Sequence, residues 1–189
     1  IGISKTGSGK TLAFGVPLLE KIIPGKGLQA AVLAPTRELA VQISAELSKF
    51  GKYLRYRIAT IYGGVSLEPQ VHELARAEIL VGTPGRVMDH LNRRTLNLTR
   101  IHTFVLDEAD KMVDMGFVED VEVILKAAPR ERQILLFGAT ISTEIENLKR
   151  RYMHDPQTAE AETYVQEDLL KQFYYNVNYR EKFSLLVHL

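Results

Sequence analysis

The sequence predicts an α/β fold: a mainly parallel sheet with helices on both faces. Short apolar runs with the length of buried strands alternate with longer stretches that have helical length and periodicity. Such alternation is typical of parallel sheets, because each crossover between parallel strands leaves room for a helix. The 189 residues, 46% hydrophobic and 25% charged, suit one domain with its own core and some additional length.

The expected strands are short apolar runs. Ile1-Gly2-Ile3 is the end of a strand, because a glycine-rich loop follows it directly. The run Phe104-Val105-Leu106 is typical of a buried parallel strand, which is apolar on both faces. After the first strand, the expected strands are, in chain order, residues 28–34, 57–61, 79–81, 103–106 and 133–137.

The expected helices lie between these strands. Residues 12–23 are apolar enough to form a helix that packs on the sheet. Thr36 can cap a helix that begins at Arg37, and Thr83 followed by Pro84 is a favoured start for another helix. In chain order the helices are expected at residues 10–23, 37–50, 67–76, 84–93, 118–127 and 143–152.

The alternating pattern does not continue to the end of the chain. We expect residues 1–155 to form the main domain. Residues 156–170 are acidic and polar with little periodicity, which predicts a linker. Residues 171–189 contain a strand-like run at 172–177 and a helix-like run at 181–189, which together are too short to bury a core. We expect them to be the start of a second domain, and the chain to be a fragment at both ends.

The loop after the first strand has the residues of a phosphate-binding loop. Gly7 and Gly9 can adopt backbone angles that turn successive N–H groups toward phosphate oxygens. Lys10 supplies a charge for the β- and γ-phosphates, and Thr11 supplies a hydroxyl for Mg²⁺. The general pattern begins with glycine where this chain has Ser4, and the alternative is a turn before an ordinary helix. The predicted nucleotide-binding residues are Ser4, Lys5, Thr6, Gly7, Ser8, Gly9, Lys10 and Thr11.

An acidic segment, Asp107-Glu108-Ala109-Asp110, follows the apolar run 104–106. A parallel strand delivers its last residues to the carboxyl edge of the sheet, where ligands of open α/β sheets bind. We expect Asp107 to bind Mg²⁺, directly or through water, and Glu108 to orient and deprotonate the water that attacks the γ-phosphorus. The alternative is a solvated turn or helix start. With the phosphate loop upstream, the pattern predicts a magnesium-dependent NTPase, with Lys10, Asp107 and Glu108 as the catalytic residues.

Composition narrows the classes of partner. The formal net charge is +1, so a nucleic acid would be bound by local contacts rather than by a generally basic surface. No apolar run reaches the roughly 18 residues that a membrane span needs. Cysteine is absent, which excludes disulfides and cysteine-ligated zinc and is compatible with a reducing cytoplasm. We expect a cytoplasmic protein, with the nucleus also open to it if the source is eukaryotic.

Further motifs complete an ordered set: Pro35-Thr36-Arg37-Glu38-Leu39-Ala40, Gly63-Gly64 and Thr83-Pro84-Gly85-Arg86. With the phosphate loop and the acidic segment, they resemble the first RecA-like domain of a DEAD-box ATP-dependent RNA helicase. The resemblance extends from Ser4 to about Tyr152. It implies a P-loop ATPase that uses ATP and Mg²⁺, clamps single-stranded RNA, unwinds short duplexes locally and remodels ribonucleoproteins.

The resemblance also implies parts that lie outside this chain. The family reads adenine through a segment with a glutamine upstream of the phosphate loop, and that segment lies before Ile1. The arginines that stabilise the transferring phosphate come from the second RecA-like domain. We therefore expect this chain alone to bind nucleotide weakly, to hydrolyse it barely and to unwind no duplex.

The predicted RNA site consists mainly of helix starts and glycines. Backbone N–H groups at a helix start can contact phosphates, and Gly63-Gly64 lets a nucleic-acid backbone approach closely. Arg37 and Arg86 add positive charge for phosphates, although the resemblance also allows both arginines a structural role, in which they hold their loops in place. Such contacts read little sequence and distinguish RNA partly by its 2′-hydroxyl. The predicted RNA-binding residues are Pro35, Thr36, Arg37, Gly63, Gly64, Thr83, Pro84, Gly85 and Arg86.

One segment departs from the family pattern. Gly138-Ala139-Thr140 stands where the family usually has Ser-Ala-Thr, whose serine hydroxyl would help to connect this segment to the acidic motif. Thr140 can retain part of the connection to Asp110. We expect ATP binding to persist and the coupling of hydrolysis to strand separation to be weaker. The predicted coupling residues are Asp110, Gly138, Ala139 and Thr140.

Two other function classes stay open. Another P-loop nucleic-acid translocase, for example on DNA, would share the phosphate and metal segments, but not the motifs at 35–40 and 83–86 together. An ATP-dependent RNA-binding clamp or scaffold with weak unwinding coupling is favoured by Gly138. The intact pair Asp107 and Glu108 opposes it, because a pure binder needs no such groups.

Overall fold

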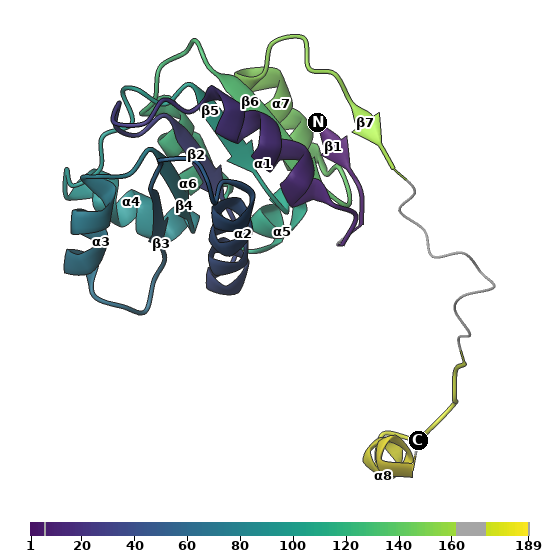
Figure 1. Ribbon diagram of the computed structural model, residues 1–189. Coiled ribbons are helices and arrows are strands. Elements are labelled where there is room, and N and C mark those ends of the chain that lie inside the picture. The colour runs from purple at the N-terminus through teal and green to yellow at the C-terminus, as the bar shows by residue number, and fades with distance from the viewer. Residues whose placement is uncertain (6, 162–172, 189) are drawn as a thin grey trace.

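The protein, described here by a computed structural model over residues 1–5, 7–161 and 173–188, contains one parallel sheet (Figure 1). Every paired strand in the described residues is parallel to its neighbours, in the order β3-β4-β2-β5-β6-β1-β7. The strands are β1 (Gly2–Ile3), β2 (Ala30–Leu33), β3 (Ile58–Ile61), β4 (Ile79–Gly82), β5 (Thr103–Leu106), β6 (Gln133–Gly138) and β7 (Ala159–Glu160). The predicted α/β fold class is confirmed.

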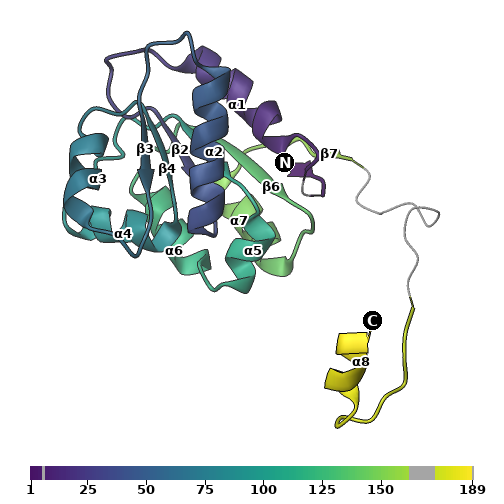
Figure 2. The same cartoon turned by 60° about the horizontal axis from the view of Figure 1, so that its bottom comes forward.

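Helices cover both faces of the sheet, with α1 and α2 on one face and α4 to α7 on the other (Figures 1 and 2). The described helices are α1 (Lys10–Lys21), α2 (Arg37–Phe50), α3 (Leu67–Leu74), α4 (Pro84–Asn92), α5 (Ala109–Asp114), α6 (Val118–Lys126), α7 (Thr143–Tyr152) and α8 (Lys182–His188). None of the described residues of α8 is buried.

The core is divided into two apolar clusters by the sheet. Within β2, Ala30 and Val32 pack toward α1 and α2, whereas Ala31 and Leu33 pack toward the other helices. Successive side chains of a strand point to opposite faces, so a strand that is covered on both faces must be apolar throughout. This explains why the central strands appear in the sequence as uninterrupted apolar runs.

The predicted elements are found within a few residues, and the differences have physical causes. Helix α5 was not predicted, because its six residues are too few to show a helical period. Strand β7 lies inside the segment that the sequence predicts as a linker, and it pairs with β1. N–H groups in and directly after β7 donate to residues in and directly before β1, Ala159 N to Ile1 O at 2.8 Å and Ala161 N to Ile3 O at 2.9 Å. Its existence depends on that pairing rather than on any pattern of its own.

The strand predicted at 172–177 is wrong for residues 173–177, which form no strand. The helix predicted at residues 181–189 is confirmed by α8, which begins one residue later and extends to the last described residue. Residues 162–172 of the predicted linker and second domain lie outside the described residues. Within the described ranges, no helix combines the length and the hydropathy needed to cross a bilayer.

A buried carboxylate joins three parts of the fold at the amino ends of β3 and β4. Glu78 is 5% exposed, and its Oε1 and Oε2 accept hydrogen bonds from Gly25 N at 2.8 Å and Arg57 N at 2.7 Å. Both donors are backbone groups in loops, which have no ladder partner there. A buried N–H that loses its acceptor costs free energy, so Glu78 stabilises the α1–β2 connection and the start of β3 together.

We therefore expect Glu78→Ala to lower the free energy of unfolding by about 2–4 kcal/mol, because two backbone donors lose a charged acceptor. Urea denaturation followed by circular dichroism measures this loss. Glu73→Ala, at an exposed position on α3, is the matched control and is expected to change stability by less than about 0.5 kcal/mol. Equal effects of the two substitutions would contradict the assignment.

Candidate nucleotide and nucleic-acid sites

A cavity of about 540 Å³ opens at the carboxyl edge of the sheet and contains both halves of the predicted nucleotide site. The loop residues Gly7 and Gly9 and the first turn of α1 line one side, and Asp107 and Glu108 line another. Helix α2 closes the cavity with side chains that the sequence did not predict for the nucleotide site. These are Glu38, Leu39, Gln42, Glu46 and Phe50.

The phosphate-loop segment has the backbone that its glycines predict. Gly7 and Gly9 have φ of 81° and 88°, a region that favours glycine. Apart from the chain neighbours, no atom of the described residues lies within 4 Å of a Cβ built at either residue. Gly9 is the N-cap of α1, and no side chain accepts a hydrogen bond there. The first N–H groups of the helix therefore have no side-chain acceptor and are directed toward the cavity. Loop and helix start therefore form a cradle of donors that fits an anion.

Polar contacts fix the ends of the same loop. Lys10 Nζ donates to Ser4 O at 2.9 Å and to Lys5 O at 3.0 Å. The hydroxyls of Ser4 and Ser8 lie 2.7 Å apart, and Ser4 N donates to Gly138 O at 3.0 Å. Ser4 is thus a buried part of the loop that bonds within it, which accounts for a serine at this position. Thr6, also predicted for this site, lies outside the described residues.

Asp107 reaches the cavity from the end of β5. Its N–H donates to Leu33 O at 3.0 Å, and its Oδ1 accepts from Glu108 N at 3.0 Å. The side chain is 3% exposed, and burial raises the pKa of its carboxyl to about 6. The Glu108 N–H and the Lys10 charge oppose that rise. The Asp107 carboxylate and the Thr11 hydroxyl line the same cavity, and oxygen ligands of this kind suit Mg²⁺.

Glu108 stands in an unusual backbone conformation at the start of α5. Its φ is 50°, a region that residues other than glycine enter at a cost. Its Oε2 pairs with Lys111 Nζ at 2.9 Å, and the hydrogen bond to Glu108 raises the pKa of Lys111. The turn places Asp107 and Glu108 side by side on the cavity wall. Lys111 was not predicted; its spacing of three residues on a helix start was the available signal.

The predicted coupling residues meet at the end of β6. Asp110 Oδ2 accepts hydrogen bonds from Ala139 N at 2.9 Å, from Thr140 N at 3.1 Å and from Thr140 Oγ1 at 3.4 Å. A Cβ added at Gly138 would lie 3.3 Å from Asp110 Oδ1, so a serine could be accommodated there after a small shift. The acidic segment and the 138–140 segment are therefore connected through backbone donors without the serine hydroxyl.

The predicted RNA-binding residues lie at starts of α2 and α4 and in the loop after β3. Thr36 Oγ1 accepts from Leu39 N at 3.3 Å, so Thr36 caps α2 as predicted, and the exposed Arg37 guanidinium lies 4.6 Å from the Tyr62 ring centroid. Thr83 is different. It precedes Pro84 at the start of α4, but its side chain makes no cap hydrogen bond.

Glycines in this region face open space. In the part of the chain that the structure describes, a Cβ built at Gly63, Gly64 or Gly85 meets no atom within 4 Å other than those of its chain neighbours and, for Gly85, of its own helix backbone. Gly64 has a φ of 82°, which by itself favours glycine, but Gly63 and Gly85 have no such requirement. Neither the packing nor the backbone of the domain explains why these two positions lack a side chain. A side chain at either position would therefore meet open space rather than the domain.

Arg86, predicted to bind RNA, lies in the interior of the domain and not on its surface. It is 9% exposed, and its Nη1 and Nη2 both donate to Val65 O at 3.0 Å. Its position supports the structural part that the family comparison allowed, rather than direct contact with a phosphate. Sequence reasoning missed the two buried residues that pack beside it, Gln70 and His90.

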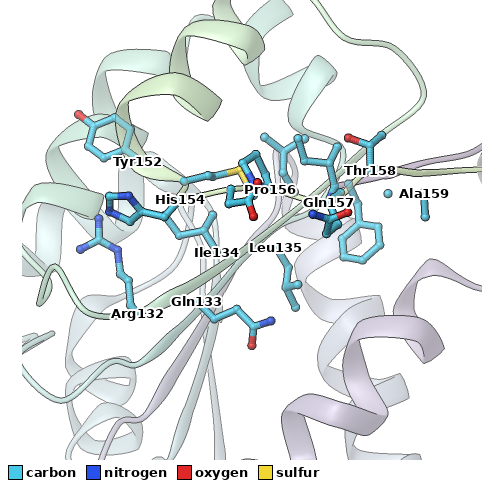
Figure 3. Close-up of a pocket in the computed structure, with 16 residues that line it drawn as sticks. Arg132, Gln133, Ile134, Leu135, Tyr152, His154, Pro156, Gln157, Thr158 and Ala159 are labelled. Atoms are coloured by element: carbon cyan, nitrogen blue, oxygen red, sulfur yellow. The ribbon is translucent and has the colours of Figure 1, made fainter.

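A second cavity, of about 510 Å³, lies on the β6–β1–β7 side of the domain (Figure 3). Its wall contains β6, residues 1–2 and the segment 152–159, with Arg132 and His154 toward one end and Thr158 toward the other. None of the predicted catalytic, metal or RNA-binding residues lines it.

Because the Asp107 carboxyl is buried, its ionisation should lower the free energy of unfolding by an amount that depends on pH. The pKa is 3.8 in the unfolded reference and about 6 in the folded domain, so the folded form takes up the proton first and stability falls as pH rises between these values. Above pH 7 the cost is complete, about 2–3 kcal/mol. We expect Asp107→Asn to raise the free energy of unfolding at pH 8, with chelator present, and to raise it little at pH 4.

Asp114→Asn, on the exposed end of α5, is the control for this measurement and is expected to have no such pH-dependent effect. Thermal denaturation of the two variants at both pH values makes the comparison. If Asp107→Asn is no more stable than the parent at pH 8, the predicted cost of the buried carboxylate is wrong.

Comparison with known proteins identifies the family. Residues 1–148 match the family model described as DEAD/DEAH box helicase. The chain is 46% identical over 192 residues to the DEAD-box ATP-dependent RNA helicase CshA of Geobacillus kaustophilus, covering 100% of this chain and 41% of that protein. It is 47% identical to CshA of Bacillus licheniformis, with 100% and 39% covered. The chain thus spans about two fifths of the length of these curated relatives.

Solved structures agree. A DEAD box protein from Methanococcus jannaschii matches with a TM-score of 0.84 and 44% identity, over 99% of this chain and 51% of that one. The yeast DEAD-box splicing factor Prp28 matches with a TM-score of 0.81 and 38% identity, over 99% and 47%. From its sequence, its parallel sheet and the motifs gathered at the carboxyl edge of that sheet, the chain belongs to the DEAD/DEAH box helicase family.

Proposed function

We propose that this chain is the ATP-binding part of an ATP-dependent RNA helicase that couples ATP binding and hydrolysis to RNA clamping, local unwinding and ribonucleoprotein remodelling. The observation that supports it most is the cavity shared by the phosphate loop and the pair Asp107 and Glu108. The predicted RNA segments follow the carboxyl ends of β2, β3 and β4, at the same edge of the sheet. Its relatives are named ATP-dependent RNA helicases, and the chain covers only part of their length.

ATP is the proposed substrate, with its phosphates in the loop. The N–H groups around Gly7 and Gly9 bind phosphate oxygens, and Lys10 exchanges its carbonyl partners for the β- and γ-phosphates. Thr11 and Asp107 would hold Mg²⁺, since a hydroxyl and a carboxylate are ligands that it prefers. When bound, Mg²⁺ neutralises charge that develops on the phosphate oxygens.

Glu108 is the proposed general base. It lies on the cavity wall next to Asp107, and its carboxylate is 12% exposed, which limits its access to bulk water. To accept a proton from the attacking water it must give up its pairing with Lys111, whose side chain is exposed and can be solvated by water instead. Glu108 then orients the water and takes its proton.

The RNA backbone is the proposed partner of the helix starts at Thr36 and Thr83 and of the open glycines at 63, 64 and 85. Backbone donors and absent side chains favour contacts to sugar and phosphate over contacts to bases. The domain offers this surface without a strongly basic charge. Binding is therefore expected to be tolerant of sequence.

The complete enzyme needs a second RecA-like domain, contributed by the same protein. That domain supplies the arginines for the transition state, and closure of the two domains over ATP and RNA assembles the site. We propose that this chain alone hydrolyses ATP barely, and that the protein works in the cytoplasm. A clamp with weak unwinding coupling is the second candidate, favoured by Gly138.

The test of the proposed activity uses the full-length protein. We expect ATPase turnover to be stimulated by a polyuridine RNA and not by the matching DNA, since the backbone site recognises the 2′-hydroxyl. Glu108→Gln is expected to reduce the stimulated rate about 100-fold or more while nucleotide binding persists, because the general base is lost. Equal stimulation by RNA and DNA would favour a different translocase, and a Glu108→Gln variant with parental turnover would rule out the base.

Gly138→Ser tests the coupling hypothesis. The added hydroxyl would lie beside Asp110, and we expect unwinding per ATP hydrolysed to rise severalfold if the missing serine weakens coupling. Gly138→Ala is the control, since it adds the same Cβ without the hydroxyl. Both strand separation and phosphate release are measured on a short duplex. An unchanged ratio in Gly138→Ser would show that the backbone donors to Asp110 are sufficient.

A further inference from the structure

A buried amide lies between two of the proposed RNA-binding segments. Gln70, on α3, is 5% exposed. Its Nε2 donates to Tyr62 O at 3.1 Å, and its Oε1 accepts from Arg86 Nη1 at 3.3 Å and lies 3.3 Å from His90 Nε2. It therefore joins the loop after β3 to α4, and it lines no part of the nucleotide cavity.

The open glycine pair is held on both sides. Gln70 binds the carbonyl of Tyr62, which precedes Gly63, and Arg86 binds the carbonyl of Val65, which follows Gly64. Arg86 in turn donates to Gln70. Glycines have the largest conformational freedom of any residue, so a loop of two glycines is not ordered by its own sequence. These two carbonyl contacts supply the order from the buried side.

The amide of Gln70 has one favourable orientation. Reversing it would direct its NH₂ at the Arg86 guanidinium and its oxygen at the Tyr62 carbonyl, which replaces attractions with repulsions. His90 is fully buried, and burial together with the Arg86 charge lowers its pKa, which favours the neutral ring. Assigning its single N–H to Nε2 gives a donor to Gln70, and Nδ1 then lies 2.8 Å from Thr95 Oγ1.

We propose that Gln70 is a positioning residue for RNA binding, which holds the Gly63-Gly64 loop and the start of α4 in one arrangement before RNA arrives. Gln70 does not touch the RNA. Because the loop is ordered in advance, binding does not have to supply that ordering free energy. The inference rests on the proposed RNA-binding function of the two segments.

The test uses Gln70→Met in the full-length protein, which keeps the side-chain volume and removes both sets of hydrogen bonds. ATPase rate is titrated with polyuridine RNA, and binding of a fluorescent ADP is measured separately. We expect the RNA concentration for half-maximal stimulation to rise about fivefold, the cost of ordering a loop on binding. The rate at saturating RNA and the ADP affinity should change less than about twofold, because the nucleotide cavity is untouched.

Gln29→Met is the matched control for a merely structural effect. Gln29 is also 5% exposed, and its amide fixes another loop through Ile23 N, Ile23 O and Gly27 O. Both substitutions are expected to lower the melting temperature. Only Gln70→Met should raise the half-maximal RNA concentration. The same rise in both variants, or no rise in Gln70→Met, would overturn the inference.

The outcomes separate this inference from the proposed function. A parent protein without RNA stimulation refutes the proposed function, and the inference with it. A stimulated parent with no specific effect of Gln70→Met refutes the inference alone. Should Gln70→Met not fold, Gln70→Glu replaces it, since it keeps the acceptor for Arg86 and His90 and loses the donor to Tyr62 O. Parental half-saturation in that variant would equally overturn the proposal.

Discussion

The parallel pairing of β5 between β2 and β6 is the constraint on which the nucleotide site depends. Its register aligns Leu106 with Leu33 on one side and with Leu136 on the other, so β2 and β5 end together at one edge while β6 continues to Gly138. Asp107 N continues that ladder by one bond to Leu33 O, and the chain then turns at Glu108. A slip of one residue in this register would move the acidic segment away from Lys10 and exchange the faces of β5.

Unfavourable local features gather where the chemistry is proposed. Asp107 is a buried carboxylate with a raised pKa, Glu108 has a positive φ, and Gly7 and Gly9 leave an open cradle. None of these features stabilises the domain. The central strands, which are apolar on both faces, stabilise it instead. A scaffold of this kind can tolerate a site whose groups are optimised for a ligand rather than for folding.

The nucleotide side and the 138–140 segment are joined by contacts through the backbone. Ser4 N donates to Gly138 O, and the next two N–H groups, of Ala139 and Thr140, donate to Asp110. The phosphate loop, the 138–140 segment and the acidic segment are therefore connected by hydrogen bonds made mostly by backbone groups. Backbone donors are available whatever residue occupies position 138, which is why Asp110 keeps its partners although the serine is replaced by glycine.

The sequence by itself determined the element types and the places of the motifs. The apolar run of β5 and the Thr36 cap of α2 are local signals, and both elements lie at the predicted residues. It also indicated that Lys10, Asp107 and Glu108 belong together. Only the tertiary structure decided that Arg86 points inward and that Gln70 and His90 bind one another, because those contacts join residues 16 and 20 positions apart. Strand β7 likewise exists through its pairing with β1. Periodicity and capping act within a few residues of the chain, whereas a buried hydrogen bond depends on which segments the fold brings together.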